Sequence, residues 1–322
     1  YDIKFETLLR FMTEISIVVP VRNEDESIKP FLQRAENVMD KIGKAYEIIF
    51  ALDPSSDNTE KIIFDEIKRN KNIRLLVFSR QFGQPAATMA GINNCKGSYC
   101  VIIDVDLQDP PELIEKLYNE IISGYEVVYA KRKSRKGETF FKKIISSIGY
   151  YLINKFSDVR IPRDAGDFRI ISRKVIIQLN ELNESHGFLR GMVAFVGFKQ
   201  SFIEYDRVKR YGGKSNYNKF FGSMKIGLNG LIGFSSRPLF LMAITGFIIA
   251  LISFLLGIWY LFQKFSGINL TPGLTTTVIL ISFFAGIQLL GLGLLGEYVG
   301  RIYDEVKKRP KYILDKKINF DE

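Results

Sequence analysis

Two apolar blocks near the C-terminal end constrain the fold of this 322-residue chain more than any other feature. They run from Leu239 to about Phe262 and from Leu274 to about Gly296. Each block exceeds the roughly 20 residues that a helix needs to cross about 30 Å of hydrocarbon. The blocks therefore predict a hairpin of two transmembrane helices, although the mean hydropathy of the whole chain, +0.04, is that of a soluble protein.

The charges around these blocks indicate which way the hairpin faces. Part of the net charge of +10 lies in two basic segments, Arg207–Lys225 and Arg301–Lys317, which flank the hairpin. The connecting loop Gln263–Gly273 carries only Lys264. Basic flanks remain on the cytoplasmic side of a membrane. We therefore expect a multi-pass protein whose two termini and large N-terminal part are cytoplasmic.

Before the hairpin, β-branched apolar runs alternate with amphipathic segments. Four strand–helix units begin with the runs Ile15–Pro20, Tyr46–Leu52, Ile73–Phe78 and Tyr99–Ile103. Such units predict an α/β fold with a mostly parallel sheet and helices on both faces, which binds ligands at the carboxyl ends of its strands. Further strands are expected at Glu126–Ala130, Asp164–Ile171 and Val196–Tyr205.

A pair of carboxylates directly follows the fourth strand. Asp104 and Asp106 are two residues apart, so an extended backbone directs both side chains to the same side. Together they can hold a hard divalent cation, Mg²⁺ or Mn²⁺, which would neutralise the diphosphate of a leaving nucleotide. A chance D-x-D is usually a solvated turn, but this one ends a buried strand and therefore predicts a metal-assisted transfer site.

The residues that continue from this pair resemble a known signature. Asp104 to Glu112 read D-V-D-L-Q-D-P-P-E, which is similar to the D-x-D-L-Q-x-P-P-E of family 2 glycosyltransferases with the GT-A (Rossmann-like) fold. Within them the chain resembles the polyprenyl-phosphate glycosyltransferases. Further family motifs are matched by Val19–Glu24, Phe82–Gln84, Met89–Gly91, Gly166–Arg169 and Leu294–Tyr303. The resemblance covers nearly the whole chain.

The resemblance implies a domain organisation. Residues 1–213 would form the cytoplasmic catalytic domain, residues 237–300 the hairpin and residues 301–322 a basic tail. Between domain and hairpin, residues 214–236 would form a loop and an amphipathic helix in the membrane interface. A tightly packed core helix is the alternative for this last segment.

The resemblance also implies a function. Members of the two-span bacterial subgroup transfer a hexose, most often glucose, from a UDP-sugar to undecaprenyl phosphate. We therefore expect a metal-dependent, inverting enzyme of the bacterial inner membrane. Its partners would be the UDP-sugar, a polyprenyl phosphate and the membrane, with no nucleic acid. Small residues on the second apolar block also favour a homo-oligomer, for example a tetramer.

Individual residues receive expected roles from the same motifs. The metal ligands would be Asp104, Asp106 and Gln108. The donor would contact Pro20, Glu24, Asp53, Asp104, Arg207, Arg210 and Lys214. The acceptor phosphate would contact Arg132, Arg135 and Arg169. The arginines and lysines could instead attract anionic lipid without specificity.

Asp106 and Asp167 are the expected catalytic residues. The resemblance assigns Asp167 to the acceptor side, where it would orient the acceptor or remove a proton as a general base. The alternative for Asp167 is a salt bridge with Arg163 or Arg169.

Two positions depart from the family pattern. The D-D-G-S that follows the second strand appears here as Leu52-Asp53-Pro54-Ser55, so one acid of the pair is missing and the nucleotide base stays open. Arg22 stands where an aromatic residue is usual.

Two other functions remain open. A processive polysaccharide synthase would resemble longer chains with a Q-x-x-R-W segment, which this sequence lacks. A non-catalytic protein that binds or translocates lipid would have no use for the D-x-D pair and Asp167.

Overall fold

One sheet organises the catalytic part of the chain, and its strand order is β7-β5-β6-β4-β1-β2-β3-β8. The computed structural model describes residues 13–133, 165–182, 184, 188–208, 232–233, 235–266 and 273–320. The strands are β1 (Ile15–Val21), β2 (Tyr46–Leu52), β3 (Ile73–Phe78), β4 (Tyr99–Ile102), β5 (Val127–Arg132), β6 (Ala165–Ser172), β7 (Gln200–Tyr205) and β8 (Leu314–Ile318).

The centre of the sheet is parallel. β1 lies between β2 and β4 and runs parallel to both, and β3 continues the sheet parallel to β2. All seven residues of β1 are buried. A strand covered on both faces reads as a continuous apolar run, which explains its sequence. β6 is antiparallel to β4 and β5, and β8 is antiparallel to β3. The expected α/β fold with a mostly parallel sheet is confirmed.

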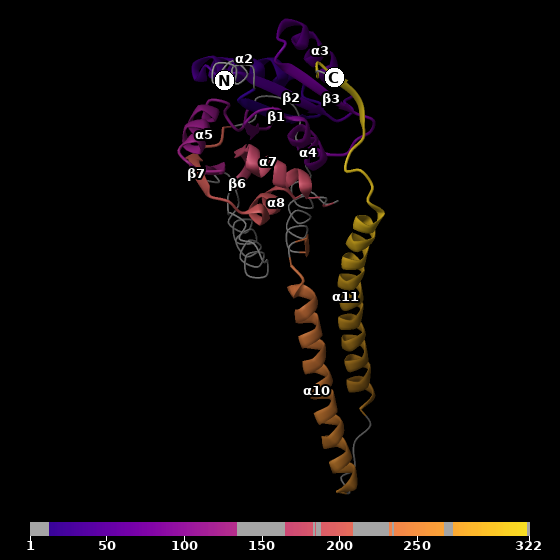
Figure 1. Cartoon of the computed structure of the whole chain (residues 1–322). Coiled ribbons are helices and arrows are strands. Elements are labelled where there is room, and N and C mark those ends of the chain that lie inside the picture. Colours follow the sequence, from indigo (N-terminus) through magenta and orange to yellow (C-terminus); the bar gives the residue numbers. More distant parts are fainter. Residues whose placement is uncertain are drawn as a thin grey trace.

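Helices cover both faces of the sheet (Figure 1). They are α2 (Asp25–Ile42), α3 (Thr59–Arg69), α4 (Gln84–Asn94), α5 (Leu113–Ile122), α7 (Arg173–Glu181) and α8 (Leu189–Val196). The apolar residues of α2, α3 and α5 share one core cluster, and those of α4, α7 and α8 share the other. At Gly91 in α4 an added Cβ would lie 2.2 Å from Val18 Cγ1, so glycine is required for α4 to pack on β1.

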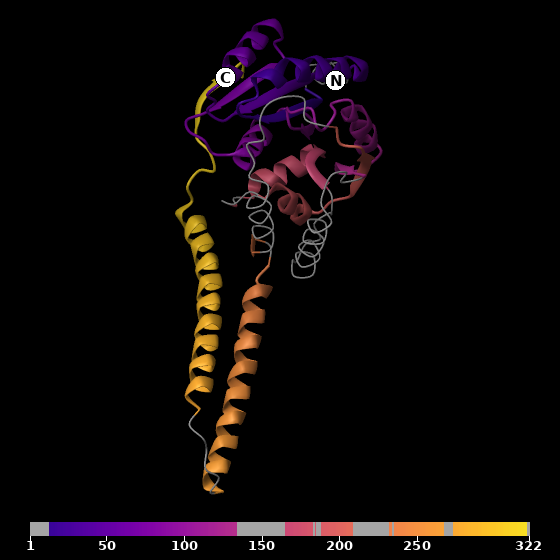
Figure 2. The same ribbon diagram turned by 180° about the vertical axis from the view of Figure 1, so that it is seen from behind.

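Two long apolar helices extend away from the sheet and run side by side (Figures 1 and 2). They are α10 (Arg237–Phe265) and α11 (Leu274–Lys307), and their apolar stretches have mean hydropathies of 2.7 and 2.1. An added Cβ at Gly291 would lie 2.9 Å from Met242 Sδ, so the second helix presents a small residue where the first approaches it. The expected hairpin is present and indicates association with a membrane.

The C-terminal tail returns to the sheet, which the sequence analysis did not predict. β8 pairs with β3, and the Ser79 amide donates a hydrogen bond to the Ile313 carbonyl at 3.1 Å. Tyr312 packs edge-on against Phe78, with 5.8 Å between ring centroids, and its hydroxyl accepts a hydrogen bond from Asn93 Nδ2. The strand was missed because it reads L-D-K-K-I, and lysines are typical of exposed edge strands.

Two other expectations need correction or fall outside the described residues. The strand expected from Val196 begins only at Gln200, because Val196 ends α8 and Gly197 then adopts a positive φ of 78°. α8 itself was not predicted. The interfacial helix expected within residues 214–236 lies outside the described residues except for 232–233 and 235–236.

The packing of the tail against β3 gives a test of its structural role. We expect Tyr312→Ala to destabilise the domain by about 2 kcal/mol, less than the roughly 3–5 kcal/mol of a fully buried aromatic side chain. That loss corresponds to a drop of about 4–8 °C in the thermal unfolding midpoint of the full-length protein. Tyr312→Phe keeps the ring and removes one hydrogen bond, so it should cost only about 1 kcal/mol. An unchanged midpoint in Tyr312→Ala would show that the tail does not stabilise the sheet.

Candidate active site

The register of β4 and β6 brings two of the predicted site residues together. β6 runs antiparallel to β4, and Ile102 pairs with Arg169. Asp104 lies two residues after Ile102, just past the end of β4, and Asp167 lies two residues before Arg169 on β6. The antiparallel direction therefore places the beginning of β6 at the edge of the sheet where β4 ends, and Asp167 stands opposite Asp104.

The neighbouring strands add their ends to the same edge. Lys131 of β5 pairs with Ala165 of β6, so Arg132 ends β5 next to the start of β6. Arg132 in turn pairs with Tyr205, the last residue of β7, and Arg207 follows. The sheet thus gathers carboxylates and arginines that are far apart in the sequence.

The D-x-D pair lies in a concentration of negative charge. Loss of solvation, followed by the charges of Asp167, Asp106 and Asp109, raises the pKa of half-buried Asp104 to about 7, while Arg207 opposes the shift. Asp104 Oδ1 accepts a hydrogen bond from Gln84 Nε2 at 2.8 Å. Within the described residues no ion pair joins Asp104 or Asp106 to a basic side chain.

A tight turn holds the second carboxylate of the pair. Leu107 has a φ of 58°, a left-handed conformation that is rare for leucine. Its side chain is nevertheless buried in the core, which holds the turn in place. The turn directs the Gln108 amide to Asp106 Oδ1 at 3.1 Å. The fold thus maintains an unusual backbone conformation where Asp106 is positioned.

These residues fit a divalent cation. Among the described residues no group of three or more His, Cys, Asp or Glu could hold a metal alone. Mg²⁺ commonly uses only one or two carboxylates and completes its coordination with water and substrate phosphates. Asp104 and Asp106 supply two carboxylates, and no ion pair in the described part of the chain occupies them, which suits such an ion. The hydrogen bonds of Gln108 among the residues described are made by its backbone. Its amide donates to Asp106 Oδ1, and its carbonyl accepts from the Val208 amide at 3.2 Å.

Asp109 fastens the loop after the D-x-D pair to the end of β7. It is 2% exposed and accepts a short hydrogen bond from the Tyr205 hydroxyl and another from Arg207 Nε at 3.2 Å. Burial, and then the charge of Asp109, raises the pKa of Tyr205 well above its usual value, so the hydroxyl keeps its proton. Neither Asp109 nor Tyr205 was predicted from the sequence to have a role. Arg207 was expected at the donor, whereas the structure shows it on Asp109.

Asp167 is held by an arginine that the sequence analysis did not identify. Arg190 of α8 donates from Nε to Asp167 Oδ1 at 2.9 Å and from Nη2 to Oδ2 at 3.4 Å. The alternative partner Arg169 lies farther away, at 3.9 Å. Burial favours the neutral acid, but the charges of Arg190, Arg169 and Arg132 outweigh it and lower the pKa of Asp167. The carboxyl group is therefore ionised at neutral pH.

Three arginines thus surround one carboxylate. Burial, opposed by Asp167, lowers the pKa of Arg169 to about 10, and its Nη2 donates to the Gly166 carbonyl at 2.8 Å. The buried Nε of Arg132 has no hydrogen-bond partner within the described ranges. An arginine within the apolar run L-R-G-M-V-A-F-V was the only sequence signal for Arg190.

The expected donor residues of β1 and β2 shape the neighbouring loops. Asp53 is 3% exposed, and its two oxygens accept the amide hydrogens of Phe82 and Gly83 at 2.9 and 2.8 Å. Glu24 accepts from Ser27 Oγ at 3.0 Å at the start of α2. Asp53 thus positions the loop before α4, whereas a contact with the donor was expected for it from the sequence.

The remaining residues singled out from the sequence lie near the end of β1 or outside the described part of the chain. Pro20 is buried near the end of β1, and the buried Nε of Arg22 has no partner among the residues described. Three expected ligands lie outside the described residues: Arg135, Arg210 and Lys214.

Comparison with known proteins agrees with this architecture. The model of the family described as glycosyl transferase family 2 matches residues 16–179. The chain belongs to glycosyl transferase family 2. As a glycosyltransferase of this family it is an enzyme, so the alternative of a non-catalytic lipid-binding protein falls away.

Relatives of this family 2 enzyme match it over almost its full length. An uncharacterised glycosyltransferase of Bacillus subtilis is 41% identical over 94% of both chains. The bactoprenol glucosyl transferase of Shigella phage SfII is 38% identical over 94% of this chain and 98% of its own. A glucosyl-3-phosphoglycerate synthase from Mycobacterium tuberculosis, solved with Mn²⁺, UDP and phosphoglyceric acid, is 17% identical over 72% of this chain and 83% of that chain, with a TM-score of 0.49.

The contacts of Asp109 predict its contribution to stability. Asp109→Ala would leave the buried Tyr205 hydroxyl and Arg207 Nε without their acceptor, at a cost of about 3 kcal/mol. We expect the thermal unfolding midpoint of the full-length protein to fall by about 6–12 °C. Tyr205→Phe removes one donor and should cost only about 1 kcal/mol. Equal midpoints for Asp109→Ala and the wild type would contradict the proposed fastening.

Proposed function

We propose that this glycosyltransferase transfers a hexose, with glucose the favoured sugar, from a UDP-sugar to polyprenyl phosphate. The observation that carries the proposal is the meeting of Asp104 and Asp106 with Asp167 and its arginines at one edge of the sheet. The first two carboxylates suit a metal–diphosphate donor, and the arginines suit an anionic acceptor. The names of relatives that act on bactoprenol support the lipid and the sugar.

The donor half consists of the D-x-D pair and the loops beside it. Asp104, Asp106 and Gln108 are the proposed metal ligands. Mg²⁺ or Mn²⁺ bound there would neutralise the donor diphosphate and stabilise UDP as it leaves. Gln84 fixes Asp104 through its hydrogen bond, and Asp53 fixes the loop that carries Gln84.

Further donor contacts are proposed from the ends of β1 and β7. Pro20 lies near the carboxyl end of β1, and Glu24 follows that strand. Three basic residues would close over the diphosphate: Arg207, Arg210 and Lys214. Arg207 could leave Asp109 for this purpose, because its side chain is 28% exposed.

The acceptor half consists of Asp167 and the arginines around it. A phosphate monoester has a second pKa of about 6 and is largely dianionic at neutral pH. It therefore needs cations more than it needs a base, and guanidinium groups bind phosphate through paired donors. We assign Arg132, Arg135 and Arg169 to this phosphate, and Asp167 to orienting it and accepting any remaining proton.

The reaction that follows is a single displacement. An oxygen of the lipid phosphate attacks the anomeric carbon from the face opposite the diphosphate. The bond between that carbon and the UDP oxygen breaks, and UDP leaves with the bonding electrons. The configuration of the sugar is inverted, and no enzyme nucleophile takes part.

The position of the site supports an acceptor that arrives from the membrane. α8, whose Arg190 contacts Asp167, lies on the side of the catalytic domain from which α10 extends, in both views (Figures 1 and 2). We propose that the enzyme resides in the bacterial inner membrane as a multi-pass homo-oligomer, with the catalytic domain and both termini in the cytoplasm.

The metal requirement can be tested together with the identity of the product. Membranes that contain the enzyme are incubated with labelled UDP-sugars and polyprenyl phosphate, with and without EDTA. We expect metal-dependent label in an acid-labile lipid, with UDP-glucose the best donor. Asp104→Asn and Asp106→Asn should lower turnover on the order of 10²–10³-fold.

Asp65→Asn is the matched control, because Asp65 is an exposed carboxylate paired with Lys68 on α3. Its turnover should equal that of the wild type. A polymeric product would favour the processive synthase instead, and full activity in EDTA would exclude the proposed metal.

The roles proposed for the acceptor half of the site can be tested separately. With donor and acceptor saturating, we expect Asp167→Asn to lower turnover by about 10²-fold or more, as is usual for a positioned catalytic group. Arg190→Gln removes the paired donors of Asp167 and should raise the KM for polyprenyl phosphate, with the KM for the donor nearly unchanged. Arg173→Gln on α7 is the control, because within the described residues its guanidinium group donates to the main-chain carbonyls of Cys95 and Gly97. Turnover of Asp167→Asn close to the wild type would remove both roles given to Asp167.

A further inference from the structure

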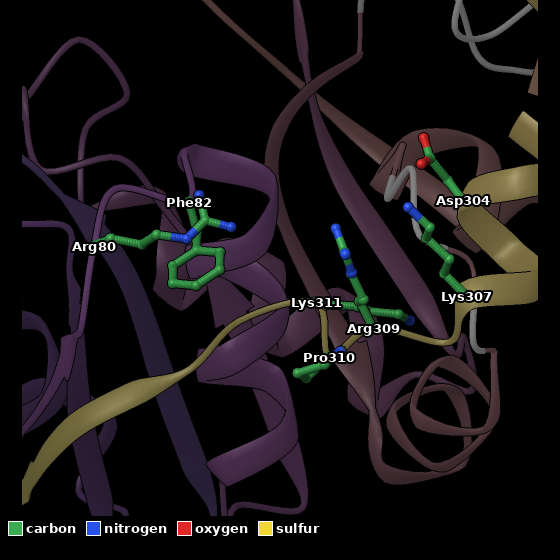
Figure 3. A pocket seen from close by; sticks show the side chains of 7 residues that line it. All are labelled: Arg80, Phe82, Asp304, Lys307, Arg309, Pro310 and Lys311. Atoms are coloured by element: carbon green, nitrogen blue, oxygen red, sulfur yellow. The ribbon is translucent and has the colours of Figure 1, made fainter. Parts of the chain in front are cut away.

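A second group of cations lies outside the proposed catalytic edge. An open pocket of about 200 Å³ separates the loop after β3 from the segment that joins α11 to β8 (Figure 3). Its lining residues are Arg80, Phe82, Asp304, Lys307, Arg309, Pro310 and Lys311. Four of these seven side chains are cationic and one is acidic. The pocket therefore has the charge of an anion-binding site.

The guanidinium groups of the two arginines in the pocket can donate hydrogen bonds to an anion. The Arg80 guanidinium lies over the Phe82 ring, 4.2 Å from its centroid, and this stacking leaves the edge of the group open. Within the described part of the chain, neither Arg80 nor Arg309 forms an ion pair. Figure 3 shows them on opposite walls of the pocket. Two guanidinium groups so placed can both donate to one phosphate.

The lysines and acids around the pocket leave the balance positive. Lys311 donates a short hydrogen bond to the Leu182 carbonyl, and burial lowers its pKa, opposed by Glu184 and Glu305. Lys307 lies over the Tyr303 ring at 3.9 Å. When Glu184 and Glu305 are counted with Asp304, three carboxylates still stand against four cations.

The pocket lies close to the proposed membrane surface. The Tyr298 hydroxyl donates to the Ser235 carbonyl at 2.7 Å, which places Tyr298 beside the start of α10. Lys307 follows nine residues later, about 13 Å along the helix. A lipid headgroup layer is about 5–7 Å thick. A long side chain from the pocket can therefore approach the headgroups, and soluble anions can also enter.

We propose that this pocket binds a phosphate-bearing anion through Arg80 and Arg309, with Lys307 and Lys311 beside them. Its occupant is either the headgroup of an acidic lipid or a soluble phosphate compound. The bound anion would contact Phe82, whose amide and that of Gly83 are held by Asp53. The site thus adjoins the loop that also carries Gln84, the partner of Asp104.

The test measures binding to the full-length protein in nanodiscs, with UDP present to occupy the donor site. In one arm inorganic phosphate or pyrophosphate is titrated calorimetrically in phosphatidylcholine discs. In the other, phosphatidylglycerol retained by the protein is measured by native mass spectrometry. The double variant Arg80→Ala/Arg309→Ala is compared with Lys61→Ala/Lys116→Ala, which removes two exposed cations from α3 and α5.

We expect the arginine double variant to bind the occupant at least about tenfold more weakly, the loss of one charge-assisted hydrogen bond, while the lysine variant binds normally. The arm in which the loss occurs identifies the occupant as lipid or soluble. Arg309→Lys keeps the charge and should retain part of the binding if the fold is intact. Equal binding of both probes by wild type and both double variants would overturn the proposal.

Discussion

The reversed direction of β6 is the constraint on which the active site depends. In a wholly parallel sheet, every strand next to β4 would bring its end to the catalytic edge, and its beginning would lie at the opposite edge. β6 runs antiparallel to β4, so its first residues reach this edge instead. Asp167 and Arg169 can therefore stand opposite Asp104, while β5 and β7 contribute Arg132 and Tyr205 from their ends. The two halves of the site are assembled by strand direction.

The distribution of charge follows from this assembly. Asp109 is already matched by Arg207 and Tyr205, and Asp167 is matched by Arg190. Within the described residues Asp104 accepts a hydrogen bond from the Gln84 amide, and burial, followed by the charges of three nearby carboxylates, raises its pKa to about 7. The carboxylates that hold the loops are thus paired with arginines, whereas no ion pair among the residues that the structure describes occupies the D-x-D pair. A divalent cation bound there would neutralise the two carboxylates and keep coordination positions for a substrate phosphate.

The sequence predicted the parts of the fold that local patterns determine. β1 to β4 are continuous apolar runs, and the D-x-D pair directly follows one of them, so strands and pair were both located. β8 was missed because its exposed edge carries charges, and its pairing with β3 depends on residues more than 200 positions away. Arg190 was missed for a similar reason. Its partner Asp167 is 23 residues away, and only the packing of α8 against the sheet brings the two together.

The signature after the D-x-D pair shows the same limit within one motif. Asp109 is buried beneath Tyr205, whereas Glu112 forms an exposed ion pair with Arg34 of α2 at 2.6 Å. The motif shows that these residues occur together in the sequence. Their burial and contacts distinguish the residues with a proposed catalytic role from those that hold the loop. Asp104 and Asp106 are the proposed metal ligands, whereas Asp109 and Glu112 hold the loop and the start of α5.

The two ends of the membrane hairpin connect to opposite edges of the sheet. The chain leaves the sheet after β7 at one edge, passes through α10 and α11, and returns as β8 at the other edge. Six residues separate Lys307 from Leu314, and they can span no more than about 25 Å. A domain that is joined to the hairpin at both edge strands can tilt less than one that is joined at a single edge strand. In the proposed transfer to a lipid phosphate, this restraint would keep the end of the sheet that carries Asp104 and Asp167 within a limited range of heights above the membrane.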